Sequence, residues 1–207
     1  MASFVFIVGC GASSHHSSTP AAFAHGAPYA QLFESGAAWT YEVATLVRFA
    51  EADLAAENHE QPETRGTIEV RCSVTEVREL IGGVASQIAC DGDPEAVGRE
   101  PIIAGVWIAS AAGVWRGDEL PAAGSAVPTG DALLPPTPVA KHEAHQGEDD
   151  DGATSFDVAQ KDGAWCETFV DASDYSLAET RCFDGGIASA HVEATGEPYR
   201  ELTYTRK

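Results

Sequence analysis

Between Thr67 and Cys90 apolar and polar residues alternate, and this alternation constrains the fold more than any other feature of the chain. One set of alternate positions is apolar or cysteine: Ile68, Val70, Cys72, Val74, Val84, Ile88 and Cys90. A period of two is typical of a β-strand with one buried face, and Gly82-Gly83 is a turn signal inside the segment. Folding back about Ile81 forms three cross-strand pairs: Cys72–Cys90, Val74–Ile88 and Arg71–Asp91. We therefore predict a β-hairpin with a Cys72–Cys90 disulfide.

A second cysteine pair repeats this arrangement around the turn Asp171-Ala172-Ser173-Asp174. Folding there gives three further pairs: Trp165–Phe183, Cys166–Cys182 and Glu167–Arg181. Four cysteines, with Cys10 set aside, allow three connectivities. No two of these cysteines have the C-x-x-C spacing of a redox motif. Cross-strand aromatic and opposite-charge pairs, worth roughly 0.2–1 kcal/mol each, favour the local connectivity. We expect a Cys166–Cys182 disulfide, and two disulfides indicate a compartment outside the cytoplasm.

The rest of the chain shows the same succession of strands and turns. Alternating segments and turn signals predict strands and hairpins over 39–49, 106–116, 156–166 and 187–206. Ala50 to Glu57 is the one segment with the pattern of a helical turn. Roughly ten strands joined by hairpin turns predict an all-β fold, in which an antiparallel meander curls into a barrel or half-barrel. Curling or covering is expected because an open sheet of this size exposes aggregation-prone edges.

Two stretches interrupt the meander. Asp118 to Pro138 is rich in Pro, Gly and Ala and is predicted to be a loop. Because it contains Leu133 and Leu134, it is either a lid over the barrel or a surface excursion with one apolar anchor.

The second stretch, 141–152, is strongly acidic. It offers two imidazoles and several carboxylates as candidate ligands for a divalent cation: His142, His145, Asp149 and Asp151. The carboxylates are consecutive, whereas in calcium loops they alternate, so the other reading is a solvated acidic loop.

Charge and missing motifs exclude several function classes. The chain carries 32 acidic and 12 basic side chains, a formal net charge of −20, which repels phosphate backbones and argues against nucleic-acid binding. No apolar run approaches the ~20 residues of a membrane-spanning helix. The sequence has no nucleophile elbow, zinc-protease helix, phosphate-binding glycine loop or dinucleotide fingerprint. We therefore expect no enzymatic activity and no cofactor.

The N-terminal stretch is free of charge, with no Asp, Glu, Lys or Arg before Glu34. An apolar run over 4–8 leads into Ile7-Val8-Gly9-Cys10, which is followed by a Ser-rich spacer. The four residues resemble the lipobox of bacterial lipoproteins, and the resemblance implies that Cys10 is lipidated and anchors the protein to a membrane. The alternative is a buried N-terminal strand with Cys10 as an ordinary thiol.

The lipobox resemblance also implies a division of the chain. Residues 1–9 are then a signal-peptide remnant, 10–31 a lipid-anchored tether and 32–207 a single β-domain. Gly11 stands where inner-membrane lipoproteins commonly have Asp, so the resemblance implies the outer membrane of a Gram-negative bacterium, with the domain facing the periplasm or the cell surface.

The start of the domain adds a second resemblance. Gly36-Ala37-Ala38-Trp39-Thr40-Tyr41 looks like the opening strand of uncharacterised bacterial surface lipoproteins. More distantly, it is similar to lipocalins, whose first strand carries G-x-W, and to the LolA/LolB lipoprotein carriers, whose unclosed barrels hold acyl chains.

Two functional classes follow. In the first, which we favour, the protein is a lipid-anchored, non-enzymatic interaction or structural module that contacts an envelope protein. In the second, the barrel cavity carries a lipid or another hydrophobic small molecule. The candidate lining residues are Trp39, Tyr41, Phe49, Trp107 and Trp115.

Overall fold

The computed structural model confirms the all-β fold. It describes residues 27–49, 63–92, 102–129, 134, 141–149, 152–161, 163–171, 177–195 and 198–207, with the backbone alone for 141–149 and 152–156. Five strands come from the first half of the chain: β1 (Ala38–Arg48), β2 (Glu63–Leu80), β3 (Gly83–Asp91), β4 (Gly105–Ser110) and β5 (Gly113–Gly117). Six come from the second: β6 (Lys141–Asp149), β7 (Gly152–Lys161), β8 (Ala164–Asp171), β9 (Leu177–Asp184), β10 (Gly186–Ala194) and β11 (Tyr199–Arg206). A single 3₁₀ turn, η2 (Ala30–Phe33), precedes β1.

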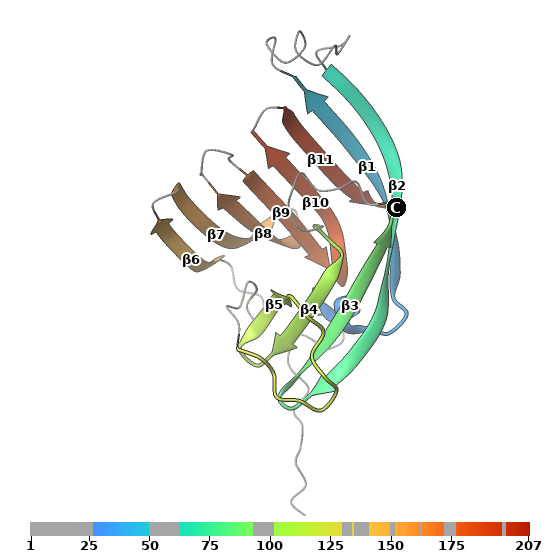
Figure 1. Ribbon diagram of the computed structural model, residues 1–207, viewed down its shortest axis with the longest axis vertical. Helices are drawn as coiled ribbons and strands as arrows, with labels where there is room; N and C mark the ends of the chain where they lie inside the picture. Colours follow the sequence, from blue (N-terminus) through green and yellow to red (C-terminus); the bar gives the residue numbers. More distant parts are fainter. Residues whose placement is uncertain are drawn as a thin grey trace, which may run out of the picture.

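All eleven strands form one antiparallel meander. The order across the sheet is β5-β4-β3-β2-β1-β11-β10-β9-β8-β7-β6, so pairing of β1 with β11 joins the two halves of the chain. The outermost strands are β5 and β6, which are consecutive in sequence but are not paired with each other. Figure 1 shows the resulting strongly curved sheet, an open half-barrel with β3–β5 and β6–β9 at its two sides.

The first predicted hairpin forms, and the part that holds the cysteines has the predicted register; between Val74 and Glu76 the register shifts by one residue toward the turn. Cys72 lies opposite Cys90, and the other pairs are as expected: Val74–Ile88 and Arg71–Asp91. The Cys72–Cys90 disulfide is present. β2 has 18 residues because it pairs with β1 along its first part and with β3 along its second. It therefore connects the strands on either side of it in the curved sheet.

The second hairpin is also confirmed. β8 and β9 pair as predicted, in the register Trp165–Phe183, Cys166–Cys182 and Glu167–Arg181. The Cys166–Cys182 disulfide is formed. The hairpins expected at 106–116 and 187–206 are β4–β5 and β10–β11.

The main core fills the interior face of the half-barrel. Trp107 in β4 contacts Phe183 in β9, edge to face, with ring centroids 6.1 Å apart. Five strands lie between β4 and β9 in the sheet, namely β3, β2, β1, β11 and β10. The sheet therefore curls far enough for its two sides to touch through their side chains. Tyr29, upstream of the expected domain start at Leu32, is fully buried in the same core.

A second apolar cluster lies on the opposite face of β3–β5. It consists of Leu80, Ala85, Val106, Ile108 and Trp115, with Leu120 and Val127 packed against them. The described part of the predicted loop, 118–129, thus packs against the outer face of the sheet. Further along, Leu134 is fully buried and exchanges two 2.9 Å backbone hydrogen bonds with Val114 in the edge strand β5. Leu134 belongs to the main core, together with Val114. Leu133 lies outside the described residues.

The acidic stretch is not the loop that its composition suggested. Its residues form β6, which pairs with β7 in a hairpin from Lys141–Ala159 to Asp149–Gly152. The expectation was wrong because β6 has no apolar alternation, and its place in the sheet depends on backbone pairing with β7. A charged edge strand is a common way to prevent edge-to-edge association of sheets.

Candidate functional site

Three of the five predicted lining residues do face the interior, where they are packed. Trp39, Tyr41 and Trp107 all belong to the main core, and Tyr41 and Trp107 are fully buried. The Tyr41 hydroxyl donates a 2.8 Å hydrogen bond to the Ile187 carbonyl oxygen. The indole Nε1 of Trp39 donates to Gln31 Oε1 at 3.1 Å. The polar ends of these two aromatic residues are therefore satisfied by the protein itself.

The other two lining candidates lie elsewhere. Trp115 pairs with Ile108, whereas Trp107 pairs with Arg116, so the two tryptophans lie on opposite faces of the β4–β5 hairpin. Trp115 is buried in the outer cluster and does not line the interior. Phe49 follows the last residue of β1 and is half-buried.

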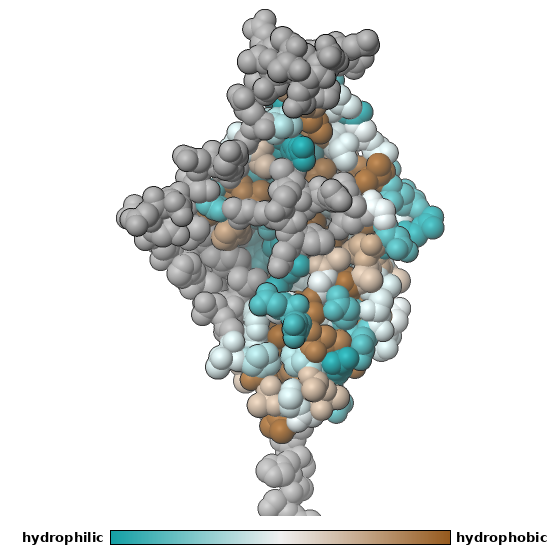
Figure 2. Space-filling model, in the orientation of Figure 1, coloured by the Kyte–Doolittle hydropathy of each residue, from teal (hydrophilic) through white to brown (hydrophobic). Residues whose placement is uncertain are grey.

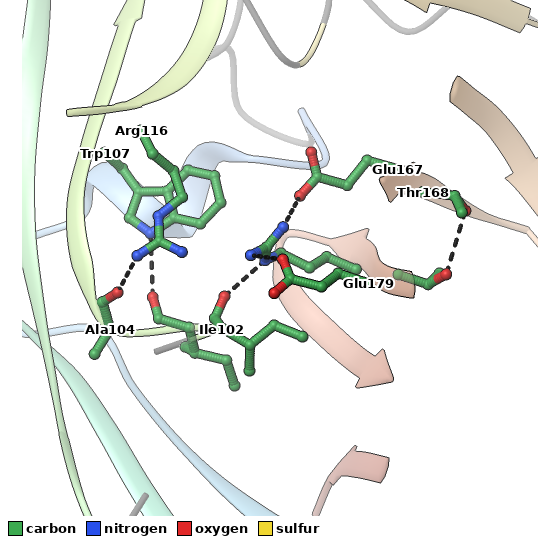
Figure 3. Close-up of polar contacts among 10 residues, drawn as sticks. Ile102, Ala104, Trp107, Arg116, Glu167, Thr168 and Glu179 are labelled. Atoms are coloured by element: carbon green, nitrogen blue, oxygen red, sulfur yellow. Dashed lines mark hydrogen bonds and ion pairs between the residues drawn. The ribbon is translucent and has the colours of Figure 1, made fainter. Parts of the chain in front are cut away.

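A short segment, Ile102–Ala104, occupies the middle of the interior, and we call it the plug. Ile102 and Ile103 are fully buried in the main core. Each of the three consecutive plug carbonyls accepts a side-chain hydrogen bond: Arg181 Nε to Ile102 at 2.7 Å, Trp107 Nε1 to Ile103 at 3.2 Å and Arg116 Nη2 to Ala104 at 2.6 Å. The donors belong to three strands, with Trp107 in β4, Arg116 in β5 and Arg181 in β9. Figure 3 shows the hydrogen bonds that the plug carbonyls accept. The plug therefore joins the two sides of the half-barrel, and the side-chain donors satisfy its backbone carbonyls, which would otherwise be buried without partners.

Arg181 is the most highly connected of these donors. Besides the plug it binds two carboxylates, with Nη1 2.8 Å from Glu167 Oε1 and Nη2 3.0 Å from Glu179 Oε2 (Figure 3). The Arg181 side chain is 6% exposed and that of Glu167 is 0% exposed, so the pair is sealed from solvent. A buried ion pair of this kind needs both partners in hydrogen-bonding geometry, because removing one partner leaves an uncompensated charge.

Burial and neighbouring charges shift the pKa values of this cluster. Desolvation raises the pKa of the Glu167 carboxyl, and the nearby Arg181 opposes that shift. Burial acts to lower the pKa of Arg181, but the carboxylates of Glu167 and Glu179 outweigh it and raise that pKa. Burial, and then the charge of Glu167, raises the pKa of Tyr29. Tyr29 packs edge to face on Phe183, with centroids 5.3 Å apart, so it extends the same cluster.

Arg116 contributes a second interior cation. Its guanidinium lies over the Trp107 ring, 5.6 Å from the centroid, while it binds the Ala104 carbonyl. The two arginines are thus used to hold the plug. This arrangement fixes the core around the plug.

Sequence reasoning identified part of this cluster. It paired Glu167 with Arg181 across β8 and β9, but it did not place the pair in the interior or connect it with the plug. The predicted β4–β5 hairpin already sets Arg116 opposite Trp107, and that was the available signal for the second cation. The plug itself has no periodic pattern that would have marked it.

The remaining candidate residues fall outside what the structure describes. Cys10 precedes the described residues. The helical turn expected at 50–57 and Asp151 lie in gaps between described ranges. His142, His145 and Asp149 lie in β6, of which only the backbone is described. Among residues with described side chains, no group of three or more His, Cys, Asp and Glu is placed to hold a metal ion.

His191 is a strand residue whose Nδ1 lies 3.0 Å from Thr203 Oγ1. Within the described part of the chain, no helix has the length and apolarity needed to cross a membrane. No protein-family model, curated protein or solved structure was found to match this chain.

Proposed function

We propose that this protein is an exported, lipid-anchored protein of the cell envelope that acts as a non-enzymatic interaction or structural module. Two disulfides, each within one hairpin, support export, because such bonds persist in oxidising compartments. The lipobox-like Ile7-Val8-Gly9-Cys10 supports an anchor, and Gly11 supports the outer membrane of a Gram-negative bacterium.

The plug is the observation that carries the choice of a module over a carrier. Its three carbonyls are held by β4, β5 and β9, and Ile102 and Ile103 are fully buried between the two sides of the sheet. A carrier for an apolar ligand needs room where these residues lie. A packed interior instead gives a rigid body whose surface contacts a partner.

The second candidate is a carrier for a lipid or another hydrophobic molecule. The observation in its favour is the open sheet: β5 and β6 are not paired with each other, so the half-barrel is not closed by backbone hydrogen bonds. An apolar molecule entering between these edges would bind beside the plug.

Cell fractionation and native mass spectrometry test both proposals. The variant Cys10→Ala is expected to move the protein from the membrane fraction to the soluble exported fraction, while Ser14→Ala in the same segment leaves it in the membrane. Membrane retention of Cys10→Ala would contradict lipid anchoring. Co-purified apolar mass in native spectra after mild detergent extraction would favour the carrier, and a clean apoprotein would favour the module.

A further inference from the structure

A polar groove lies at the end of the sheet where β1 begins and β11 ends. Its volume is about 850 Å³, and residues 31 and 34–40, β2 and the last two residues of the chain line it. From β2, Glu69 and Arg71 form one wall of the groove. Figure 1 marks the C-terminus here, and Figure 2 shows hydrophilic side chains gathered at the same place.

Backbone hydrogen bonds fix the rim of the groove. Gln31 N donates to the Gly185 carbonyl at 2.6 Å, Val74 N to that of Ala37 at 2.8 Å, and Lys207 N to that of Thr40 at 2.9 Å. The rim is therefore tied to three parts of the sheet. A preformed site of this kind loses little conformational entropy when a ligand binds.

The lining of the groove is richer in basic side chains than the protein as a whole. Its lining has three basic side chains, Arg71, Arg206 and Lys207, against two acidic ones, Glu34 and Glu69. The whole chain has 12 basic and 32 acidic side chains. A quarter of the basic residues thus gather in one groove, where a small anion meets a local attraction on an otherwise repulsive surface.

Glu69 marks where an anion would be held. Its carboxylate lies between two cations, with Arg71 Nη2 2.6 Å and Lys207 Nζ 3.0 Å from its oxygens. Hydrogen bonds from Lys207 and Arg71 lower the pKa of the Glu69 carboxyl. The Arg71 and Lys207 side chains are 74% and 47% exposed, and ion pairs between exposed side chains contribute little net stability. A carboxylate or phosphate from outside can therefore compete with Glu69 for these two cations.

We propose that this groove binds a small polar anion, whose carboxylate or phosphate group takes the place of Glu69 between Arg71 and Lys207. Arg206, whose guanidinium donates to the Asp184 carbonyl at 3.2 Å, supplies a further cation for a ligand that extends along the groove. The volume suits a small organic molecule. This binding site is independent of lipid anchoring and of the packed interior.

Titration of the purified full chain with inorganic phosphate and, separately, with succinate tests the proposal. Amide chemical shifts in ¹⁵N-labelled protein report the site, and comparison of the two probes distinguishes a phosphate ligand from a carboxylate ligand. We expect saturable shifts confined to the amides of Gly36, Thr40, Arg71 and Lys207. The double variant Arg71→Gln/Lys207→Gln should weaken binding about tenfold, because it removes two charge-assisted hydrogen bonds. Arg65→Gln, an exposed cation of β2 outside this groove, is the matched control and should leave the affinity unchanged.

Glu69→Gln gives a test of opposite sign. Because it removes the carboxylate that competes for Arg71 and Lys207, it should tighten binding by about threefold. Glu63→Gln on the same strand should have no effect. Saturable shifts with this pattern of variants support the site. Absence of localised shifts with both probes, equal weakening by Arg65→Gln, or weaker binding by Glu69→Gln would overturn it.

Discussion

Arg181 Nη1 lies 2.8 Å from Glu167 Oε1 inside the half-barrel, and the same guanidinium binds the plug carbonyl of Ile102 at 2.7 Å. One side chain of β9 thus neutralises a buried carboxylate of β8 and fixes the segment that enters β4. Because the Glu167 carboxylate is shielded from water, its negative charge can be buried only with this cationic partner.

Arg181→Met is therefore expected to lower the free energy of unfolding by about 3–5 kcal/mol, because Glu167 is left buried and unpaired. Arg65→Met is the control: its side chain is 70% exposed in an ion pair with Glu63, and its loss should cost less than about 1 kcal/mol. Urea unfolding measures both.

The double variant Glu167→Leu/Arg181→Met should recover much of the lost stability, because replacing both members of a buried ion pair by apolar residues is often neutral. A small effect of Arg181→Met, similar to that of Arg65→Met, would show that the interior pair does not stabilise the fold.

The two disulfides should contribute similar amounts of stability. They join cysteines 18 and 16 residues apart, and the chain-entropy model gives about 3 kcal/mol for loops of this length. We expect Cys72→Ala/Cys90→Ala and Cys166→Ala/Cys182→Ala each to reduce the free energy of unfolding by about that amount in urea titrations. A loss of stability confined to one of the two pairs would show that loop length is not the main cause of the stabilisation.

Gly105 is expected to resist substitution more than other glycines with positive φ. Its φ is +126°, and a Cβ there would lie 2.6 Å from Arg116 Nη2, the atom that binds the Ala104 carbonyl. Gly105→Ala should cost about 2–3 kcal/mol, since backbone strain is joined by displacement of Arg116 from the plug.

Gly124→Ala is the matched control, with φ +74° and no atom within 4 Å of its Cβ. It should show the backbone strain alone, about 1 kcal/mol, when thermal unfolding of the two variants is compared. Equal losses would mean that the contact with Arg116 is unimportant.

The buried tyrosines should make the stability of the protein depend on pH in the alkaline range. Burial raises the pKa values of Tyr29 and Tyr41 above the ordinary value of 10, and that of the half-buried Tyr199, which faces Glu201 and Glu193, rises to about 12. The folded state holds these protons more tightly than the unfolded state. Their contribution to stability is complete below pH 10 and is lost as the pH rises through the folded-state pKa values.

Absorbance of the tyrosinate ion during an alkaline titration checks this prediction. The native protein should show tyrosines that ionise only well above pH 10, and Tyr199→Phe should remove the component near 12. Simultaneous ionisation of all tyrosines near pH 10 while the protein remains folded would contradict it.

The sequence was sufficient to predict the two disulfide-bonded hairpins and the register around their cysteines. Cys72–Cys90 and Glu167–Arg181 follow from short segments with clear alternation and a turn between them, so each pairing is local. β6 escaped prediction because its position depends on backbone pairing with β7, and backbone hydrogen bonds leave no trace in the pattern of side chains.

Only the tertiary structure decided how the interior is filled. Alternation shows which side chains share a face, but a hollow barrel and a packed one have the same alternation. The meeting of Trp107 with Phe183 and the convergence of Arg116 and Arg181 on the plug depend on how far the sheet curls. The pairing of β1 with β11 joins strands from opposite ends of the chain, and no local pattern in the sequence specifies it.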